Sequence, residues 1–228
     1  MRAAAQTVGV VTGLLVEADC LSGSSANPRI YVSAGNAVNA YGGAVQLIAD
    51  GAKALLSFGI AGGLDPNLPP GTLVLARAVI GPRGTRYDCD PNWRGMVCSD
   101  ARGHIDFTDG AIAGSDSPIL GQAGKAKLFR GSGAVAVDME SHAVARAAKE
   151  KNVPFLALRA IADPAGRDVP EWIMIGVDSG GRTRIAPVLA KLLFRPWEIP
   201  RLLELAKDQK TALSALRRVA DLAALTRF

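Results

Sequence analysis

Short apolar segments alternate with longer amphipathic or polar ones along most of this chain. The segment ALLSFGI (54–60) is apolar at almost every position, which is typical of a strand buried on both faces of a parallel sheet. Strands that alternate with helices indicate βαβ units, so the pattern predicts an α/β fold with a mostly parallel sheet. Strands are expected at residues 8–11, 28–33, 54–60, 72–80, 111–114, 134–137 and 155–160, and helices at 37–54, 125–129, 140–151, 185–194 and from about 200 onward.

Two parts of the chain depart from this alternation. Residues 81–109 are polar and rich in Gly, Pro and Asp, so they predict either an active-site flap or a disordered loop. Residues 185–194 place Ile185, Val188, Leu189, Leu192 and Leu193 at the spacing of a helix with one apolar face. Since 228 residues suit one well-cored α/β domain, we expect a single domain over 1–228 with a basic helical extension at about 178–228.

The charge of the chain is concentrated in that extension. From residue 178 onward there are ten Lys or Arg and five Asp or Glu, which accounts for the whole formal net charge of +5. A basic tail with apolar residues such as Phe194 and Trp197 fits peripheral contact with an anionic membrane, and it equally fits packing on the core or on a dimer partner. The first 177 residues are balanced in charge, which argues against binding of nucleic acid.

Cysteine and histidine usage restricts the kinds of site that the chain can form. Three cysteines without close pairs fit a reducing cytosol rather than a disulfide framework. With two histidines in the chain, the ligand set is too thin for a zinc site. The N-terminal apolar run ends in Glu17 and Asp19, so we interpret it as a first strand, not a signal peptide. No stretch is long and apolar enough to cross a bilayer. We expect a cytoplasmic protein, which would be membrane-peripheral if the basic tail contacts a membrane.

Two acidic residues follow predicted strands. Asp163 comes after the strand at 155–160 and before Pro164, at the kind of strand end where open α/β sheets place their ligand sites. Glu140, in VDMES, comes after the strand at 134–137. Each has a structural interpretation as well, since Asp163 fits a turn or helix cap and Glu140 fits a first-turn acid that favours the helix dipole.

Two further features have both a chemical and a structural interpretation. A Glu17 paired with Arg159 would stay ionised and accept a proton from water, although the same two residues would also form a plain ion pair. Gly62 and Gly63, in SFGIAGGLDP, would let the backbone approach a ligand closely. This segment is neither a GxGxxG nor a Walker A motif, so it is weak evidence alone.

In combination, GVVTGLLVEAD, SFGIAGGLDPNLPPGTLV and VDMESHAVARAAKEKNVPFLALRAIADPAG resemble the nucleoside phosphorylase and nucleosidase superfamily over roughly residues 8–170. Within it, the chain resembles the hopanoid-associated phosphorylases or nucleosidases. The resemblance implies a three-layer α/β/α fold around a central mixed, mostly parallel sheet. It also implies an enzyme that cleaves the N-glycosidic bond of an adenine nucleoside. The implied substrate is adenosylhopane, from which adenine release gives ribosyl- or phosphoribosyl-hopane in hopanoid lipid biosynthesis.

The resemblance also implies a role for each candidate residue. Asp163 would protonate purine N7, Glu17 would activate or position water, and Arg159 would help to hold the nucleophile. Met139 and Glu140 would bind the ribose. The implied substrate-binding residues are Met139, Glu140, Ile119, Ala61, Gly62 and Gly63, with Ile119 offering backbone groups to adenine. No cofactor or metal is implied, and inorganic phosphate is the candidate co-substrate.

The chain departs from the family pattern at three places. The turn Ser33-Ala34-Gly35-Asn36 has one Gly where a GxG-type phosphate turn is expected, Ile60 replaces a polar residue, and Pro118 replaces a stacking aromatic. Hydrolysis and phosphorolysis therefore stay open, with Glu17 favouring hydrolysis. The same residues also fit a soluble purine nucleoside phosphorylase, a methylthioadenosine or adenosylhomocysteine nucleosidase, and a non-catalytic nucleoside-binding module. The expected partners are a small or lipid-linked nucleoside and a second copy, as a homodimer.

Overall fold

The structure is a computed structural model that describes residues 7–22, 28–176, 178, 180–182, 184–192 and 194–226. An eight-stranded sheet lies at its centre, with the path β2-β1-β3-β7-β6-β4-β5 and with β8 paired to β3 and β4. The strands are β1 (Val8–Thr12), β2 (Arg29–Val32), β3 (Ala54–Gly63), β4 (Leu73–Ile80), β5 (Arg86–Asp88), β6 (Thr108–Gly114), β7 (Ala136–Asp138) and β8 (Phe155–Asp163).

The sheet curls until five of its strands form a closed ring. β3 pairs with β7 and β8, β8 continues to β4, β4 to β6, and β6 returns to β7. The antiparallel pairs are β3–β7, β4–β5 and β4–β8, and the remaining pairs are parallel. The predicted mixed, mostly parallel sheet is therefore confirmed.

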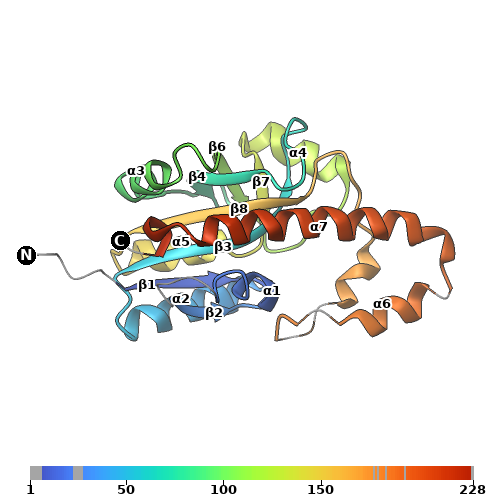
Figure 1. Ribbon diagram of the computed structural model, residues 1–228, viewed down its shortest axis with the longest axis horizontal. Helices are drawn as coiled ribbons and strands as arrows, with labels where there is room; N and C mark the ends of the chain where they lie inside the picture. The colour runs from blue at the N-terminus through green and yellow to red at the C-terminus, as the bar shows by residue number, and fades with distance from the viewer. Residues whose placement is uncertain are drawn as a thin grey trace, which may run out of the picture.

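Helices cover both faces of this sheet (Figure 1). α2 (Ala37–Ala49) and α5 (Ser141–Glu150) pack against each other and against β1 and β3, while α7 (Ile199–Ala220) runs along β8 and β3. α3 (Pro91–Asp100) packs against α8 (Ala223–Thr226), and α4 (Gln122–Ser132) precedes β7. The short α1 (Leu15–Ala18) lies between β1 and β2 in the chain. The predicted α/β/α layering is confirmed.

One part of the structure extends beyond the sheet. α6 (Ile185–Leu192), the 3-10 helix η2 (Pro196–Glu198) and the first half of α7 form this extension, which we call the arm (Figure 1). The 3-10 helix η1 (Glu171–Gly176) leads into it and contacts α6. Leu193 and the side chains of Ile185 and Leu189, which the predicted apolar helix face included, lie outside the described residues. In the described part of the chain, none of the helices is both long enough and apolar enough to cross a membrane.

The structure differs from the predicted ends of two elements, and the second of these lies at the site. The helix predicted at 37–54 ends at Ala49, because Gly51 adopts a left-handed conformation with φ of 101°. The strand predicted at 54–60 continues through Ala61–Gly63, where Gly62 and Gly63 pair with β7.

Residues 81–109 are neither a flap over the site nor a disordered loop. They form β5, α3 and the start of β6. Pro91 occupies the first turn of α3, and the Asp90 carboxylate caps it by accepting from Trp93 N at 2.8 Å. The Trp93 side chain is fully buried and its Nε1 donates to the Ala224 carbonyl. Trp93 thus belongs to the core although the segment around it is polar, and its contact with Ala224, far along the chain, is not visible in the local sequence.

Candidate active site

A cavity of about 550 Å³ lies at the edge of the sheet where β1, β2, β3 and β8 end. Because these strands are parallel to one another, the residues that follow them converge on the same edge. The lining residues are Gly13, Leu14, Glu17, Ala34, Gly35, Ile60, Ala61, Gly62, Ser117, Pro118, Ile119, Leu120, Val137, Asp138, Met139, Glu140, Asp163, Ile173, Asp178 and Gln209.

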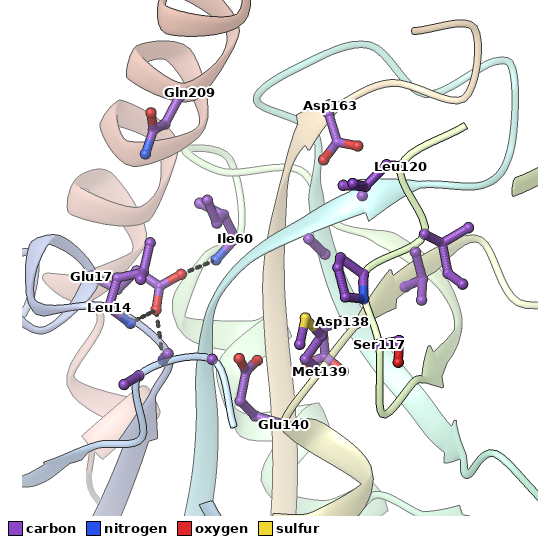
Figure 2. A pocket seen from close by; sticks show the side chains of 18 of the residues that line it. Leu14, Glu17, Ile60, Ser117, Leu120, Asp138, Met139, Glu140, Asp163 and Gln209 are labelled. Atoms are coloured by element: carbon purple, nitrogen blue, oxygen red, sulfur yellow. Dashed lines mark hydrogen bonds between the residues drawn. The ribbon is translucent and has the colours of Figure 1, made fainter. Parts of the chain in front are cut away.

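Glu17 is held rigidly at one side of the cavity. Its Oε2 accepts from the backbone N–H groups of Gly13 at 2.7 Å and Leu14 at 2.8 Å, and its Oε1 accepts from Ile60 N at 2.8 Å (Figure 2). A Cβ at Gly59 would lie 2.6 Å from Oε1, so β3 needs a glycine beneath this carboxylate. Burial raises the pKa of Glu17, against the opposing effects of Arg159 and the three N–H groups. Glu17 is therefore a fixed, poorly solvated carboxyl group, as a base toward water requires.

Glu140 faces the same space from the start of α5. It is the N-cap residue, yet its side chain makes no capping hydrogen bond, so the helix-terminus interpretation does not explain it. A Cβ at Gly13 would lie 2.9 Å from Glu140 Oε1, which places the carboxyl against the β1 turn. Burial, with repulsion from Asp138, raises the pKa of Glu140 to about 8, although Arg159 opposes the shift. Met139 lines the cavity beside it.

Arg159 lies behind the cavity and does not line it. Its Nε donates to Asp138 Oδ2 at 2.6 Å, and its Nη2 donates to Ser57 Oγ at 2.8 Å and lies 3.6 Å from Glu140 Oε2. The predicted pair with Glu17 is wrong, since among the described residues the ion pairs of Arg159 are with Asp138 and Glu140. Arg159 is thus a buried counterion for these two carboxylates and reaches Glu17 only through its longer-range charge.

Asp163 is the last residue of β8 and lines the opposite end of the cavity from Glu140 (Figure 2). Its Oδ2 accepts from Lys125 Nζ at 2.6 Å. Burial raises the pKa of Asp163, and the ammonium of Lys125 opposes that effect. A Cβ at Gly62 would lie 3.2 Å from Oδ2 and 3.4 Å from Oδ1, so the absence of a side chain there leaves room beside this acid.

Two further segments line the cavity. One is residues 117–120, which include Ile119, and the other is the end of β3, where Ala61 and Gly62 form part of what we call the floor. Gly63, predicted to bind substrate, is not among the lining residues. A Cβ there would instead lie 3.3 Å from the backbone of Pro164 and Ala165, so Gly63 allows β3 to pack under the turn after β8.

The turn after β2 has an unusual backbone. Ala34 and Gly35 both line the cavity, and both have left-handed conformations, with φ of 56° and 68°. Such a conformation costs a residue with a Cβ about 1–2 kcal/mol. The sequence has one Gly in this turn where the family pattern has two. Ala34 nevertheless adopts the left-handed conformation, at the cost of backbone strain.

Several residues of the site were not predicted from the sequence. Asp138 lies in the same VDMES motif as Glu140, but its pairing with Arg159 depends on the fold. Lys125 had no local signal, since it lies in a polar helix far from the motifs. Ile173 and Gln209 come from η1 and α7 and line the cavity only because the chain returns to it. Within the described residues no group of His, Cys, Asp and Glu is arranged to hold a metal ion.

The comparisons with known proteins agree with this geometry. Residues 36–175 match the family model described as the phosphorylase superfamily. Over 167 residues the chain is 33% identical to a futalosine hydrolase of Streptomyces coelicolor, which covers 59% of this chain and 66% of that protein. The chain thus spans slightly less than two thirds of the length of this relative.

Solved structures with the same fold include two kinds of nucleosidase. The futalosine hydrolase of Helicobacter pylori matches with a TM-score of 0.61 at 20% identity, over 71% of this chain and 89% of that one. The 5′-methylthioadenosine/S-adenosylhomocysteine nucleosidase of Neisseria meningitidis, in complex with methylthio-immucillin-A, matches with a TM-score of 0.70 at 19% identity, over 96% and 99%. The chain belongs to the phosphorylase superfamily. The predicted superfamily is confirmed.

Proposed function

We propose that this protein is an N-glycosidase that hydrolyses a purine nucleoside. The observation that carries the proposal is the spacing of three carboxyl groups around one cavity, with Asp163 at one end, Glu140 at the other, and Glu17 at the side (Figure 2). Cleavage of an N-glycosidic bond needs a proton for the leaving base, support for the sugar hydroxyls, and an activated nucleophile. Each of the three groups suits one of these tasks.

The proposed reaction assigns Glu140 to the ribose, where its carboxyl group can hydrogen-bond with both hydroxyls of a diol. Protonated Asp163 gives its proton to N7 of the purine as the C1′–N9 bond breaks and its electron pair moves into the base. Water adds its oxygen to C1′ and loses a proton to Glu17. Proton donation of this kind typically contributes about 10² to 10⁴-fold to the rate.

Two features favour water over phosphate as the nucleophile. The backbone N–H groups of Gly13 and Leu14, which together resemble an anion-binding turn, are already occupied by the Glu17 carboxylate. The described cavity lining contains five acidic residues and no Lys, Arg or His. A phosphate dianion entering this space would find no cationic side chain in the described lining to pair with it, and an unpaired buried charge is costly.

For the substrate we propose adenosylhopane, as the resemblance implies, and the arm supports a lipid-linked nucleoside. Phe194, Trp197 and Leu203 are 81%, 72% and 66% exposed there. Leu203 precedes the cavity-lining Gln209 by six residues of α7, or about 9 Å along the helix. A lipid held at the arm would therefore be close to the cavity. The competing candidate is futalosine, for which the 33% identical relative is named.

The test is base release from adenosylhopane in vesicles, beside methylthioadenosine, inosine and futalosine, each with and without phosphate. We expect release from the lipid nucleoside at a rate that phosphate does not change, and we expect Asp163→Asn to slow it by about 10² to 10⁴-fold. Release that requires phosphate would overturn the hydrolase proposal. A preference for a soluble nucleoside would overturn the lipid substrate, and binding without release from any of the four would indicate a binding module.

Contact of the arm with an anionic membrane is a separate proposal. The exposed apolar residues of the arm lie among Lys191, Arg195 and Arg201, which alternate with Glu198 and Glu204. We expect the protein to sediment with vesicles that contain phosphatidylserine, and the double variant Phe194→Ser/Trp197→Ser to stay in solution. If the double variant instead changes the oligomeric state without vesicles, the arm joins two copies and the membrane proposal fails.

A further inference from the structure

Lys125, on α4, has no exposed surface and points into the turn that follows β8. Its Nζ donates to Asp163 Oδ2 at 2.6 Å and lies within hydrogen-bond distance of three carbonyl oxygens, those of Pro164 at 3.0 Å, Arg167 at 3.1 Å and Asp163 at 3.3 Å. An ammonium group has three N–H donors, so these acceptors use all of them. A fully buried lysine is rare and persists only when it is paired in this way.

The contacts give the two oxygens of the Asp163 carboxyl different surroundings. Oδ2 is taken by the ammonium, whereas no side chain of the described residues donates to Oδ1. The Asp163 side chain is 23% exposed and lines the cavity. Lys125 also ties together the carbonyls of residues 163, 164 and 167, which fixes the turn that carries this acid. The geometry leaves Oδ1 as the oxygen available to a ligand.

We propose that Lys125 is a positioning residue of the reaction, which fixes the turn after β8 and occupies Oδ2 so that Oδ1 alone exchanges a proton with the substrate base. This inference rests on the proposed hydrolysis, in which Asp163 protonates the leaving base. After the proton has left Oδ1, the ammonium stabilises the carboxylate that remains, until solvent returns a proton.

Other charges also face Asp163. The negative charge of Asp208, on α7, raises the pKa of Asp163. Asp208 is itself paired with Arg167, whose Nε lies 3.0 Å from Asp208 Oδ2. Lys125 therefore lowers the pKa of Asp163, whereas Asp208 and burial raise it. Because Lys125 lowers the pKa of Asp163, its removal should raise that pKa, whereas a neutral substitution on the exposed part of α4 should not.

The experiment compares the pH profiles of kcat/KM for wild type, Lys125→Met, Lys125→Arg and Lys127→Met. Lys127 is exposed on the same helix and serves as the matched control. The reaction needs protonated Asp163, so activity falls on the alkaline limb. For Lys125→Met we expect this limb to move to higher pH, because the pKa of Asp163 rises without the ammonium. We also expect kcat near pH 7 to fall on the order of 10²-fold, as misplacement of a reacting group by about 1 Å does. Lys125→Arg should keep the limb near its wild-type position, and Lys127→Met should change neither.

The outcomes separate the two proposals. Loss of kcat in Lys125→Met with an unmoved limb would indicate a structural role alone and overturn the inference, as would a wild-type rate and profile. If Lys125→Met does not fold, an alkaline limb that moves to higher pH in Lys125→Arg would overturn the inference. If wild type releases no base from any nucleoside, the proposed function fails first. If Asp163→Asn is inactive and Lys125→Met is normal, only the role of Lys125 fails.

Discussion

Replacing Glu140 by Gln should stabilise the protein at alkaline pH and leave it nearly unchanged at acidic pH. The carboxyl is 8% exposed and its pKa is raised to about 8 from an ordinary value of 4.5. Between these two values the folded protein keeps a proton that the unfolded chain has lost. The free energy of unfolding therefore falls as pH rises through this window, and the penalty is complete above pH 8.

The structure sets the size of the effect. A gap from 4.5 to about 8, at about 1.4 kcal/mol for each pKa unit, corresponds to ~5 kcal/mol. Water entry and side-chain relaxation reduce such penalties, so we expect a difference of at least ~2 kcal/mol between the variant and wild type at pH 9. At pH 5 the wild-type carboxyl is protonated and isosteric with the amide, so the difference should be close to zero.

Urea denaturation of wild type and Glu140→Gln at pH 5, 7 and 9 measures this difference directly. Asp106→Asn is the control, because Asp106 is an exposed carboxyl remote from the cavity lining. A constant difference between Glu140→Gln and wild type across this pH range would refute the reasoning, since it would mean that Glu140 is ionised in the folded protein throughout. A variant that becomes relatively less stable as pH rises would refute it more strongly.

Three further substitutions test other contacts of the site. Asp163→Asn should lower kcat by about 10² to 10⁴-fold and should also lower thermal stability, because the buried Lys125 loses its counterion; an active variant in a base-release assay would remove Asp163 from the mechanism. Gly59→Ala places a Cβ 2.6 Å from Glu17 Oε1, so we expect a loss of about 1–3 kcal/mol in urea denaturation and a lower kcat; unchanged values would mean that the carboxylate is not held as described. Arg159→Met leaves Asp138 buried without its counterion and should cost about 3–5 kcal/mol, which calorimetry would register as a large fall in Tm, whereas a neutral effect would contradict the buried pair.

The sequence was most informative where burial alone decides the structure. β3 and β8 are apolar along most of their length because both faces are covered, and this pattern identifies them without further context. It failed at their ends, since Ala61–Gly63 has the composition of a loop and continues as a strand only because β7 pairs with it. It failed for α3 as well, because the burial of Trp93 depends on contact with Ala224.

The candidate site divides in the same way. Glu140 and Asp163 follow strands, and an acid at a strand end is visible in a sequence. The partner of each acid is not visible, because Arg159 pairs with Asp138 rather than with Glu17, and Lys125 reaches Asp163 from a separate helix. Which charge neutralises which depends on side-chain directions inside the core, and residue spacing along the chain carries no such information.

The central position of β3 in the sheet has a consequence for motion. β3 pairs with β1, β7 and β8, and it also supplies the N–H of Ile60 that binds Glu17 and the glycine beneath that carboxylate. Its amide hydrogens should exchange with solvent only when the whole domain unfolds. The floor of the cavity is therefore as rigid as the protein itself. Adjustment to a ligand should come from lining segments outside β3, such as residues 117–120 and η1, where backbone amides should exchange through small local openings.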